Sequence, residues 1–253
     1  MKPLLTTVIF DWAGTTIDYG CIAPVNAFLT AFQSAGFNPT LDEVRAPMGM
    51  QKRAHIEAML EGKPHTTQDV DRIYADFESA LFEVLPNHTD PIPGVLETVE
   101  KLRKLGLKIG STTGYTASMM DIVRPLSAEK GYAPDVLVCP DDVTGVGRPY
   151  PYMLWRNLEK LRVTSIEQVI KIGDTTADIL EGKNAGAISV GVLLGSSMIG
   201  LTEAEFADLA PEEATRVLEK ARTTYNQAGA DFVIPEITAL PDLIETINTE
   251  RGA

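Results

Sequence analysis

A carboxylate stands directly after an apolar run near the start of the chain. The run Leu4–Phe10 carries no charge, which predicts a buried strand, and Asp11 follows it at the head of the small-residue loop Ala13–Thr16. Open α/β sheets place their chemistry at the carboxyl ends of such strands. A capping aspartate is the alternative interpretation, and this strand alone does not separate the two.

Three later segments carry reactive side chains at comparable positions. A predicted strand runs into hydroxyl residues, a lone cation precedes a helix, and another strand ends in paired acids: Ser111, Thr112, Thr113 and Gly114; Arg148; Asp174 and Asp178. The order of nucleophilic aspartate, hydroxyl, cation and acidic pair resembles the four motifs of the haloacid dehalogenase superfamily of phosphotransferases. The resemblance spans residues 4–195.

Asp11 as a nucleophile needs an electrophile that a carboxylate can attack, and phosphorus is the usual one. Two negatively charged groups then meet, so the pattern predicts a divalent metal between them. Asp11 and Asp174 each offer a ligand oxygen, and hard oxygen ligands favour Mg²⁺. Asp178, one helical turn later, is predicted to ligate through water or to orient Asp174. Alternatively, Asp174 and Asp178 are an N-cap and a first-turn acid of a helix.

The predicted phosphoryl site also contains hydroxyl and guanidinium groups. Thr113, with the backbone N–H of Gly114, is predicted to bind phosphoryl oxygens, and Thr112 is the competing candidate. Arg148 offers a fork of donors to the same group. Much of the superfamily has lysine at this position, so Arg148 departs from the pattern. An ordinary surface cation before a turn is its alternative interpretation.

Phosphatases of the superfamily carry a second aspartate two positions after the nucleophile, where this chain has Ala13. Without that acid the protein is either inactive or acts on a substrate whose leaving group needs no protonation by an acid. Lys52 offers a different electron sink, because an amine condenses with a carbonyl to give an iminium. Cleavage of a phosphorus–carbon bond beside an iminium leaves an enamine instead of a carbanion. A solvated helix charge is the alternative interpretation of Lys52.

Taken together, these segments resemble the phosphonoacetaldehyde hydrolase (phosphonatase) family nearly end to end. The Trp-Ala-Gly run after Asp11 makes the resemblance specific. It implies that Asp11 is the nucleophile, that Lys52 forms a Schiff base, and that Mg²⁺ is held by Asp11, the Ala13 carbonyl and Asp174. It further implies cleavage of phosphonoacetaldehyde to acetaldehyde and phosphate, a cytoplasmic location and a homodimer.

Other residues near the predicted pocket have supporting roles. His55, three residues after Lys52 and on the same helical face, is predicted to relay protons during iminium formation. A half-buried polar contact is the alternative. Tyr115 is predicted to reach the Lys52 amine or the substrate. A low-polarity pocket would lower the pKa of that amine. The residues predicted to shape the substrate pocket are Cys21, Met48 and Gly49.

Alternating segments predict an α/β fold with a Rossmann-like parallel sheet and right-handed crossovers. The core is assigned to residues 1–18 and 88–253, and residues 19–87 form a small helical cap inserted after the first strand. His65 and His88 fall in turn-like segments and are predicted to be surface residues. The predicted strands are 4–10, 107–113, 135–139, 169–173, 187–192 and 231–234.

Composition restricts the class of protein. Hydrophobic residues make up 44% of the 253, enough for a core, and the net charge of −13 argues against nucleic acid and anionic membranes as partners. Cys21 and Cys139 are too few for a disulfide framework and suit a reducing cytosol. No apolar run approaches the ~18 residues that a membrane span needs.

Two other functions stay open from the sequence. A phosphomonoester hydrolase or mutase of the same superfamily would be expected to have an acid in place of Ala13, and it has no need for Lys52. A non-catalytic phospholigand-binding protein would explain the missing acid. The presence of Asp11, Arg148 and Asp174 argues against that third function.

Overall fold

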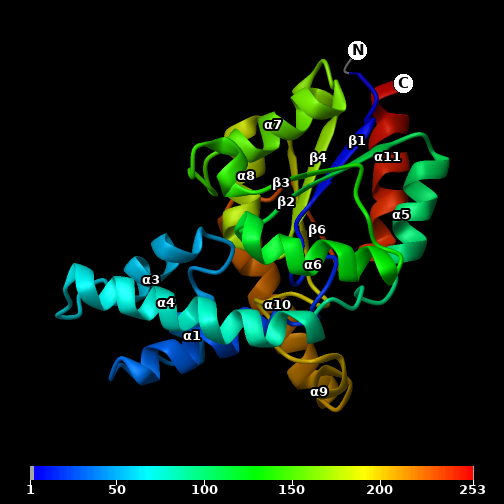
Figure 1. Cartoon of the computed structure of the whole chain (residues 1–253). Helices are drawn as coiled ribbons and strands as arrows, with labels where there is room; N and C mark the ends of the chain where they lie inside the picture. The colour runs from blue at the N-terminus through cyan, green and yellow to red at the C-terminus, as the bar shows by residue number, and fades with distance from the viewer. Residues whose placement is uncertain (1–2, 253) are drawn as a thin grey trace.

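The computed structural model describes residues 3–252, and its centre is a sheet of six parallel strands in the order β3-β2-β1-β4-β5-β6 (Figure 1). The predicted α/β class with a parallel sheet is confirmed. The first strand begins later than expected, because Leu4 is 52% exposed and pairing starts at Thr7. The strands are β1 (Thr7–Phe10), β2 (Lys108–Thr112), β3 (Val136–Val138), β4 (Val169–Gly173), β5 (Ile188–Val192) and β6 (Phe232–Ile234).

Strand β1 lies in the middle of the sheet, between β2 and β4, and all its residues are buried. Phe10 pairs with Ser111 of β2 and with Ile172 of β4. Because the strands are parallel, the residues that follow them emerge at one edge of the sheet. The strand order also reverses beside β1, and such switch points are where open α/β sheets bind ligands.

Helices cover both faces of this sheet, as right-handed crossovers require (Figure 1). One face carries α5 (Val95–Lys104), α6 (Ala117–Glu129) and α11 (Leu240–Gly252). The other carries α7 (Tyr152–Leu161), α8 (Thr176–Ala185) and α10 (Pro211–Gln227), with the short α9 (Glu203–Ala207) beyond the sheet. Helix α8 packs against β4 and β5, so its first turn lies beside the end of β4.

Four helices between β1 and α5 project from one end of the core (Figure 1). Helix α4 begins at a capping box formed by Thr66 and Asp69, and α2 begins at another. Apolar residues of α1 and α4 face each other, and the rings of Phe28 and Phe77 stack at 4.0 Å between centroids. The four are α1 (Ile22–Ser34), α2 (Leu41–Arg45), α3 (Lys52–Leu60) and α4 (Thr67–Val84).

We propose that this four-helix unit is the cap domain, residues 19–87, on a core of 1–18 and 88–253. The two connections between the units lie side by side, since Ile92 donates its N–H to Thr16 O (2.9 Å). An ion pair also joins them, with His88 Nδ1 at 2.8 Å from Asp18 Oδ1. His88 is therefore more than the surface residue that the sequence indicated, because pairing with a buried carboxylate depends on the tertiary fold.

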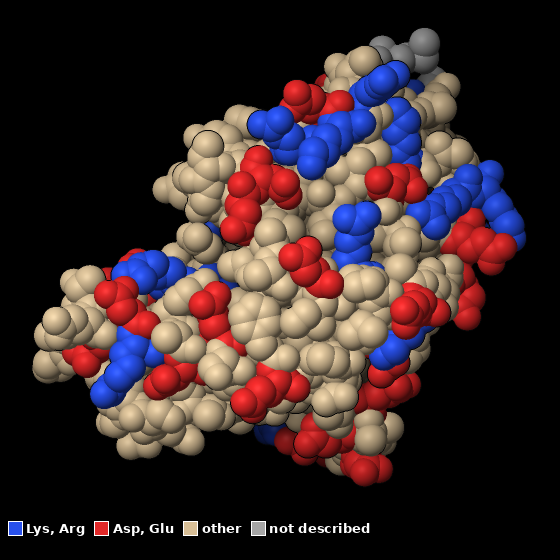
Figure 2. Space-filling view, in the orientation of Figure 1, with Lys and Arg blue, Asp and Glu red and all other residues tan. Residues whose placement is uncertain are grey.

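Acidic and basic side chains are unevenly spread over the face shown in Figure 2. Lys and Arg gather toward the end of the molecule with the termini, and Asp and Glu prevail around α9 (Figures 1 and 2). The outline is indented where the cap helices meet the core. In residues 3–252 no helix combines the length and apolar character needed to cross a membrane.

Candidate active site

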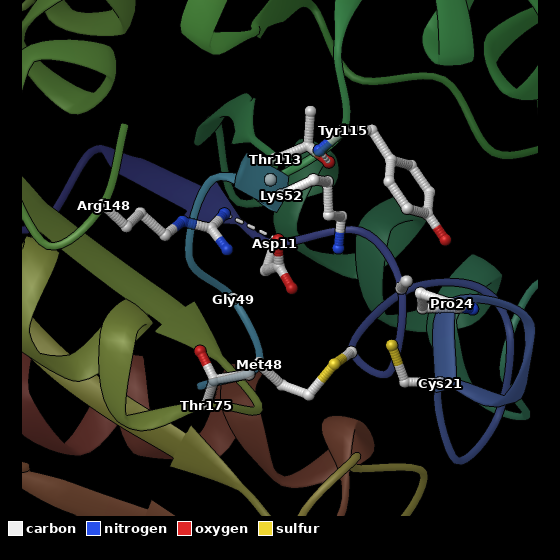
Figure 3. Close-up of a pocket in the computed structure, with 12 residues that line it drawn as sticks. Asp11, Cys21, Pro24, Met48, Gly49, Lys52, Thr113, Tyr115, Arg148 and Thr175 are labelled. Atoms are coloured by element: carbon white, nitrogen blue, oxygen red, sulfur yellow. Dashed lines mark hydrogen bonds and ion pairs between the residues drawn. The ribbon is translucent and has the colours of Figure 1, made fainter. Parts of the chain in front are cut away.

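A pocket lies between the carboxyl edge of the sheet and the cap (Figure 3). The core contributes Asp11, Ala13, Thr113, Gly114, Tyr115, Arg148 and Thr175. The cap contributes Cys21, Pro24, Met48, Gly49 and Lys52.

Asp11 is placed by the strand that precedes it and by a tight loop that follows. Its N–H donates to Ile172 O (3.0 Å), which extends the β1–β4 ladder by one residue. The N–H groups of the next turn converge on the Trp12 carbonyl, with Thr16 N at 2.7 Å. Gly14 has φ +82°, and a Cβ there would collide with the Asp174 carboxylate. The loop therefore needs glycine at this position.

Arg148 is buried at the base of the pocket, and all three of its guanidinium nitrogens face carboxylates. Nη2 donates to Asp11 Oδ1 (2.6 Å), Nη1 lies 2.9 Å from Asp178 Oδ1, and Nε donates to Glu181 Oε2 (3.1 Å). Burial by itself would lower the pKa of Arg148, but Asp11, Asp178 and Glu181 outweigh it and raise the pKa. The alternative of an ordinary surface cation does not fit these contacts.

Asp174 is fully buried beside Asp11. The backbone N–H and the hydroxyl of Ser197 both donate to its Oδ2, at 2.8 and 2.6 Å, and the Thr15 hydroxyl donates to its Oδ1 (3.2 Å). Tyr225 donates its hydroxyl to the Asp174 carbonyl (2.6 Å). Burial and the neighbouring carboxylates of Asp11 and Asp178 raise the pKa of Asp174 well above its usual value.

Asp178 has a structural and an electrostatic role at once. Its Oδ2 accepts the Thr175 hydroxyl (2.5 Å) in the capping box of α8, so the helix-start interpretation applies to Asp178. Its Oδ1 lies 2.7 Å from Lys171 Nζ and also faces Arg148. Burial favours a raised pKa for Asp178, but Arg148 and Lys171 outweigh burial and lower it.

The carboxylates of Asp11, Asp174 and Asp178 form a group that fits a metal ion. Each offers an oxygen, and these oxygens lie within 4.8 Å of one another in a buried place. Donor sets made only of oxygen suit hard divalent cations. The raised pKa of Asp174 indicates that nearby cations of the protein do not offset the negative charge there. Ala13, which lines the pocket, follows Asp11 by two residues.

The two candidate threonines after β2 lie in different surroundings. Thr113 lines the pocket with Gly114. Thr112 is not among the lining residues, and its hydroxyl is occupied: it donates to Glu181 Oε2 (2.9 Å) and accepts from Arg148 Nη2 (2.8 Å). Thr113 is thus the better placed of the two for a ligand, and Thr112 lies behind Arg148.

Lys52, the first residue of α3, points its amine into the pocket from the cap side (Figure 3). It is only 3% exposed, so a solvated helix charge does not describe it. Its Nζ lies 5.6 Å from the ring centre of Phe28 and 5.2 Å from that of Tyr115. Within residues 3–252 no carboxylate pairs with it. Burial lowers the pKa of Lys52 from its usual value.

The remaining predicted pocket residues surround this amine. Tyr115 is buried, and burial raises the pKa of its hydroxyl well above the usual value. Cys21, in the left-handed conformation, and Met48 direct their sulfur atoms toward the pocket (Figure 3). Gly49 has φ +86° and lies against the Thr175 side chain, where a Cβ would collide.

His55 is fully buried but does not line the pocket. Its Nε2 lies 2.9 Å from the Val44 carbonyl, and its ring packs against that of Phe28 at a tilt of 30°, with 3.9 Å between centroids. Nδ1 has no partner. Burial and the nearby Lys52 lower the pKa of His55 well below the usual value. The structure therefore places His55 behind the Lys52 amine, with Phe28 in contact with both.

Several residues of the site were not singled out from the sequence. Lys171 forms an ion pair with Asp178, and Glu181 forms one with Arg148. The Ser197 hydroxyl donates to Asp174. One signal was present, because Lys171 is a charge in an otherwise apolar strand. Glu181 follows Asp178 by three residues and so shares its helical face. Ser197 comes from a loop after β5, and only the fold brings it to Asp174.

Comparisons with known proteins identify relatives of this chain. Residues 8–192 match the model of the haloacid dehalogenase-like hydrolase family. The phosphonoacetaldehyde hydrolase of Lysinibacillus sphaericus is 50% identical, with 97% of this chain and 96% of the relative covered. That of Bacillus cereus is 45% identical, with 98% of each covered.

Among solved structures, a phosphonoacetaldehyde hydrolase-like protein from Oleispira antarctica superposes with a TM-score of 0.93 at 33% identity. The match covers 100% of this chain and 96% of that one. Both the sequence and the structural similarity extend over the core and the cap. The chain is thus an enzyme, a hydrolase, and it belongs to the phosphonoacetaldehyde hydrolase family of haloacid dehalogenase-like hydrolases.

Proposed function

We propose that this enzyme hydrolyses the phosphorus–carbon bond of phosphonoacetaldehyde to acetaldehyde and phosphate. The observation that carries the proposal is the buried amine of Lys52, which faces the Asp11 carboxylate across a small pocket (Figure 3). A phosphomonoester hydrolase has no use for such an amine. The names of the relatives support the same substrate.

The surroundings of Lys52 suit the formation of an imine. Only the neutral amine attacks an aldehyde, and burial shifts the lysine toward that form. Attack on the aldehyde carbon followed by loss of water gives an iminium whose α-carbon bears the phosphonate. Tyr115, whose ring lies beside the amine, restricts water on that side.

Asp11 then attacks phosphorus in line with the phosphorus–carbon bond. That bond breaks, and its electron pair enters the former iminium to give an enamine on Lys52. The phosphoryl group moves to Asp11. Protonation of the enamine carbon and attack of water on the resulting imine release acetaldehyde and free Lys52. A second water hydrolyses the aspartyl phosphate to phosphate.

This sequence of steps explains Ala13. A phosphomonoester needs an acid at that position to protonate its leaving alcohol. Here the leaving group is an enamine stabilised by the nitrogen of Lys52, so the bond breaks without an acid at residue 13. We infer that the Arg148 guanidinium, Thr113 and the Gly114 N–H, whose residues line the pocket, stabilise the oxygens of the transferred group.

We propose Mg²⁺ as the metal, held by Asp11, the Ala13 carbonyl and Asp174, with Asp178 acting indirectly. When bound, it would reduce the repulsion between the Asp11 carboxylate and the phosphonate. The all-oxygen donor set of these buried carboxylates supports a hard divalent cation.

The test combines trapping with a matched pair of lysine variants. Wild type, Lys52→Arg and Lys63→Arg are incubated with phosphonoacetaldehyde and Mg²⁺, with and without borohydride. We expect a reduced two-carbon adduct on Lys52 by peptide mass spectrometry and phosphate release without borohydride. Lys52→Arg should lose at least about 1,000-fold in rate. Lys63→Arg, at a half-exposed cap lysine, should match wild type.

Each other outcome has a clear meaning. Phosphate release without an adduct, or a near wild-type rate for Lys52→Arg, would support the proposed reaction but contradict the imine intermediate. Neither phosphate nor adduct, together with turnover of a phosphomonoester panel, would favour the phosphatase or mutase. Phosphate and Mg²⁺ binding without any turnover would favour a binding protein.

A homodimer is also part of the proposal. Its support is an exposed aromatic cluster near Arg148, in which Tyr150 stacks on Tyr152 and Tyr152 meets Trp155 edge to face. Tyr150 is 56% and Trp155 47% exposed, and exposed apolar clusters of this kind commonly mark interaction sites. Light scattering of wild type and Trp155→Glu tests it, since a dimer built on this cluster should dissociate in the variant. A cytoplasmic location stays a prediction.

A further inference from the structure

Behind the pocket, the fully buried charged residues Glu181 and Lys171 touch Arg148 or its partners, and the proposed reaction gives neither of them a role. Glu181 lies on α8, and Lys171 lies on the neighbouring strand β4. Their Nζ and Oε2 atoms are 3.5 Å apart. Burying charges costs free energy that a well-packed apolar pair would not. The position of this pair next to Arg148 suggests a function for it.

One oxygen of Glu181 collects three donors. Its Oε2 accepts Arg148 Nε (3.1 Å) and the Thr112 hydroxyl (2.9 Å), and Lys171 Nζ approaches the same atom. Its Oε1 has no hydrogen-bond partner among residues 3–252. A carboxylate selected only for stability would be expected to use both oxygens. All of these contacts are made by Oε2, the oxygen that accepts the hydrogen bond from Arg148.

The effect on Arg148 follows from the shape of its side chain. A guanidinium is planar, and carboxylates on three nitrogens fix both its position and the plane of its fork. Asp11 and Asp178 hold the two terminal nitrogens, and Glu181 holds Nε. Without Glu181 the guanidinium can pivot about its contacts with the other two acids.

Lys171 keeps the arrangement balanced in formal charge. Arg148 and Lys171 contribute two positive charges, and Asp178 and Glu181 contribute two negative ones, so this four-residue cluster sums to zero. The charges of Asp11 and Asp174 are then left for the metal and the substrate. A lysine in place of Arg148 has a single nitrogen and cannot meet three acids at once.

We propose that Glu181, held by Lys171, is a positioning residue that sets the plane of the Arg148 guanidinium for phosphoryl transfer. It acts through Arg148 and does not touch the substrate. The proposal rests on the proposed function for its kinetic test, and a binding test keeps it independent of the substrate.

The experiment compares Glu181→Gln, the double variant Lys171→Met/Glu181→Gln, and Ser189→Ala. Glutamine preserves the size of the side chain and removes its charge. The double variant removes one charge of each sign and so restores the balance. Ser189 packs under α8, where its hydroxyl donates to Ile179 O (3.0 Å), away from Arg148. It controls for a general loosening of that helix.

Two readouts are measured for each variant. The first is the separation of kcat from KM with phosphonoacetaldehyde. The second is the affinity for orthovanadate, an analogue of the transition state of phosphoryl transfer. It is compared with the affinity for inorganic phosphate, and both are measured with Mg²⁺. A group that acts mainly in the transition state affects kcat and the vanadate affinity more than KM and the phosphate affinity.

For Glu181→Gln and the double variant we expect a fall of about 10- to 100-fold in kcat and in vanadate affinity, and a change below about threefold in KM. Ser189→Ala should keep wild-type values. Recovery in the double variant would overturn the proposal, because charge balance alone would then explain the pair. Unchanged vanadate affinity in both variants would also overturn it. If wild type does not turn over the substrate, the proposed function fails, and the vanadate measurement still decides the role of Glu181.

Discussion

Two buried cations face the same pocket from opposite sides and are held in opposite ways. Arg148, from the core, meets a carboxylate at each of its three nitrogens. Lys52, from the cap, has its amine near the rings of Phe28 and Tyr115 and has no carboxylate partner in residues 3–252.

The difference in partners decides what each cation can do. Carboxylates raise the pKa of Arg148, so it stays charged and fixed in direction. Apolar burial lowers the pKa of Lys52, so its amine loses a proton more easily and keeps its lone pair available. We therefore propose that the core side of the pocket orients a phosphoryl group and that the cap side reacts with a carbonyl.

The largest effect on the difference between the two cations is expected from the substitution Arg148→Lys. The substitution keeps the charge but removes two of the three nitrogens that meet acids. We expect kcat to fall about 100-fold, because a single ammonium cannot present a fixed fork to the phosphoryl oxygens. Borohydride trapping on Lys52 should persist, since the cap side is unchanged. Loss of trapping together with turnover would contradict the separation of the two roles.

The pH dependence of trapping measures the cap side directly. The lowered pKa of Lys52 means that the neutral amine appears below its usual midpoint of 10.5. The initial rate of adduct formation should rise about tenfold per pH unit below the lowered pKa and level off above it. Between the lowered pKa of the folded state and the usual pKa of the unfolded state, Lys52 binds a proton only in the unfolded chain. In this pH range Lys52 therefore makes the stability of the fold rise with pH. A midpoint at or above 10.5 would contradict the account of burial.

Phe28→Leu tests the wall of the Lys52 site. The smaller side chain leaves a void beside the amine and loses the stacking on Phe77 and the ring contact with His55. Thermal unfolding should report a loss of about 1–2 kcal/mol. The trapping rate at neutral pH should fall several-fold, as water reaches the amine and its pKa rises. Phe32→Leu, at another buried position of α1, is the control for stability alone.

The smallest effect is expected at a third, half-exposed cation. The Asp18 carboxylate raises the pKa of His88, so the pair's contribution to stability is complete below the unfolded pKa of about 6.5 and is lost as pH rises through the raised value. His88→Gln should remove under about 1 kcal/mol of stability, because solvent screens the pair. Denaturant titrations at pH 5 and pH 8 should differ for wild type and converge for the variant. Equal wild-type stability at both would exclude a titrating pair.

The order of the elements could be predicted closely from the sequence, because the signals are local. Apolar runs, glycines and capping residues such as Thr40 and Thr66 depend on neighbours a few residues away. The proposed nucleophile, Asp11, and the acidic pair of Asp174 and Asp178 could be named for the same reason, since each follows a recognisable strand.

The partners of these residues were decided by the tertiary structure. Thr112 and Thr113 are adjacent and chemically alike, and only the fold turns Thr113 to the pocket and Thr112 to Glu181. Ser197 reaches Asp174 across 23 positions, and Glu181 reaches Arg148 across 33. Local patterns carry no information about such contacts.

What the sequence determined by itself was which groups can react: a carboxylate at a strand end, an amine after a break in the cap, and an alanine where an acid is usual. What the tertiary structure alone decided was the pKa and the orientation of these side chains. Burial without a carboxylate partner makes Lys52 easier to deprotonate, whereas three carboxylates keep Arg148 charged. The physical reason is that a side chain's pKa and orientation depend on solvent exclusion and on charges from distant segments, which only the folded chain assembles.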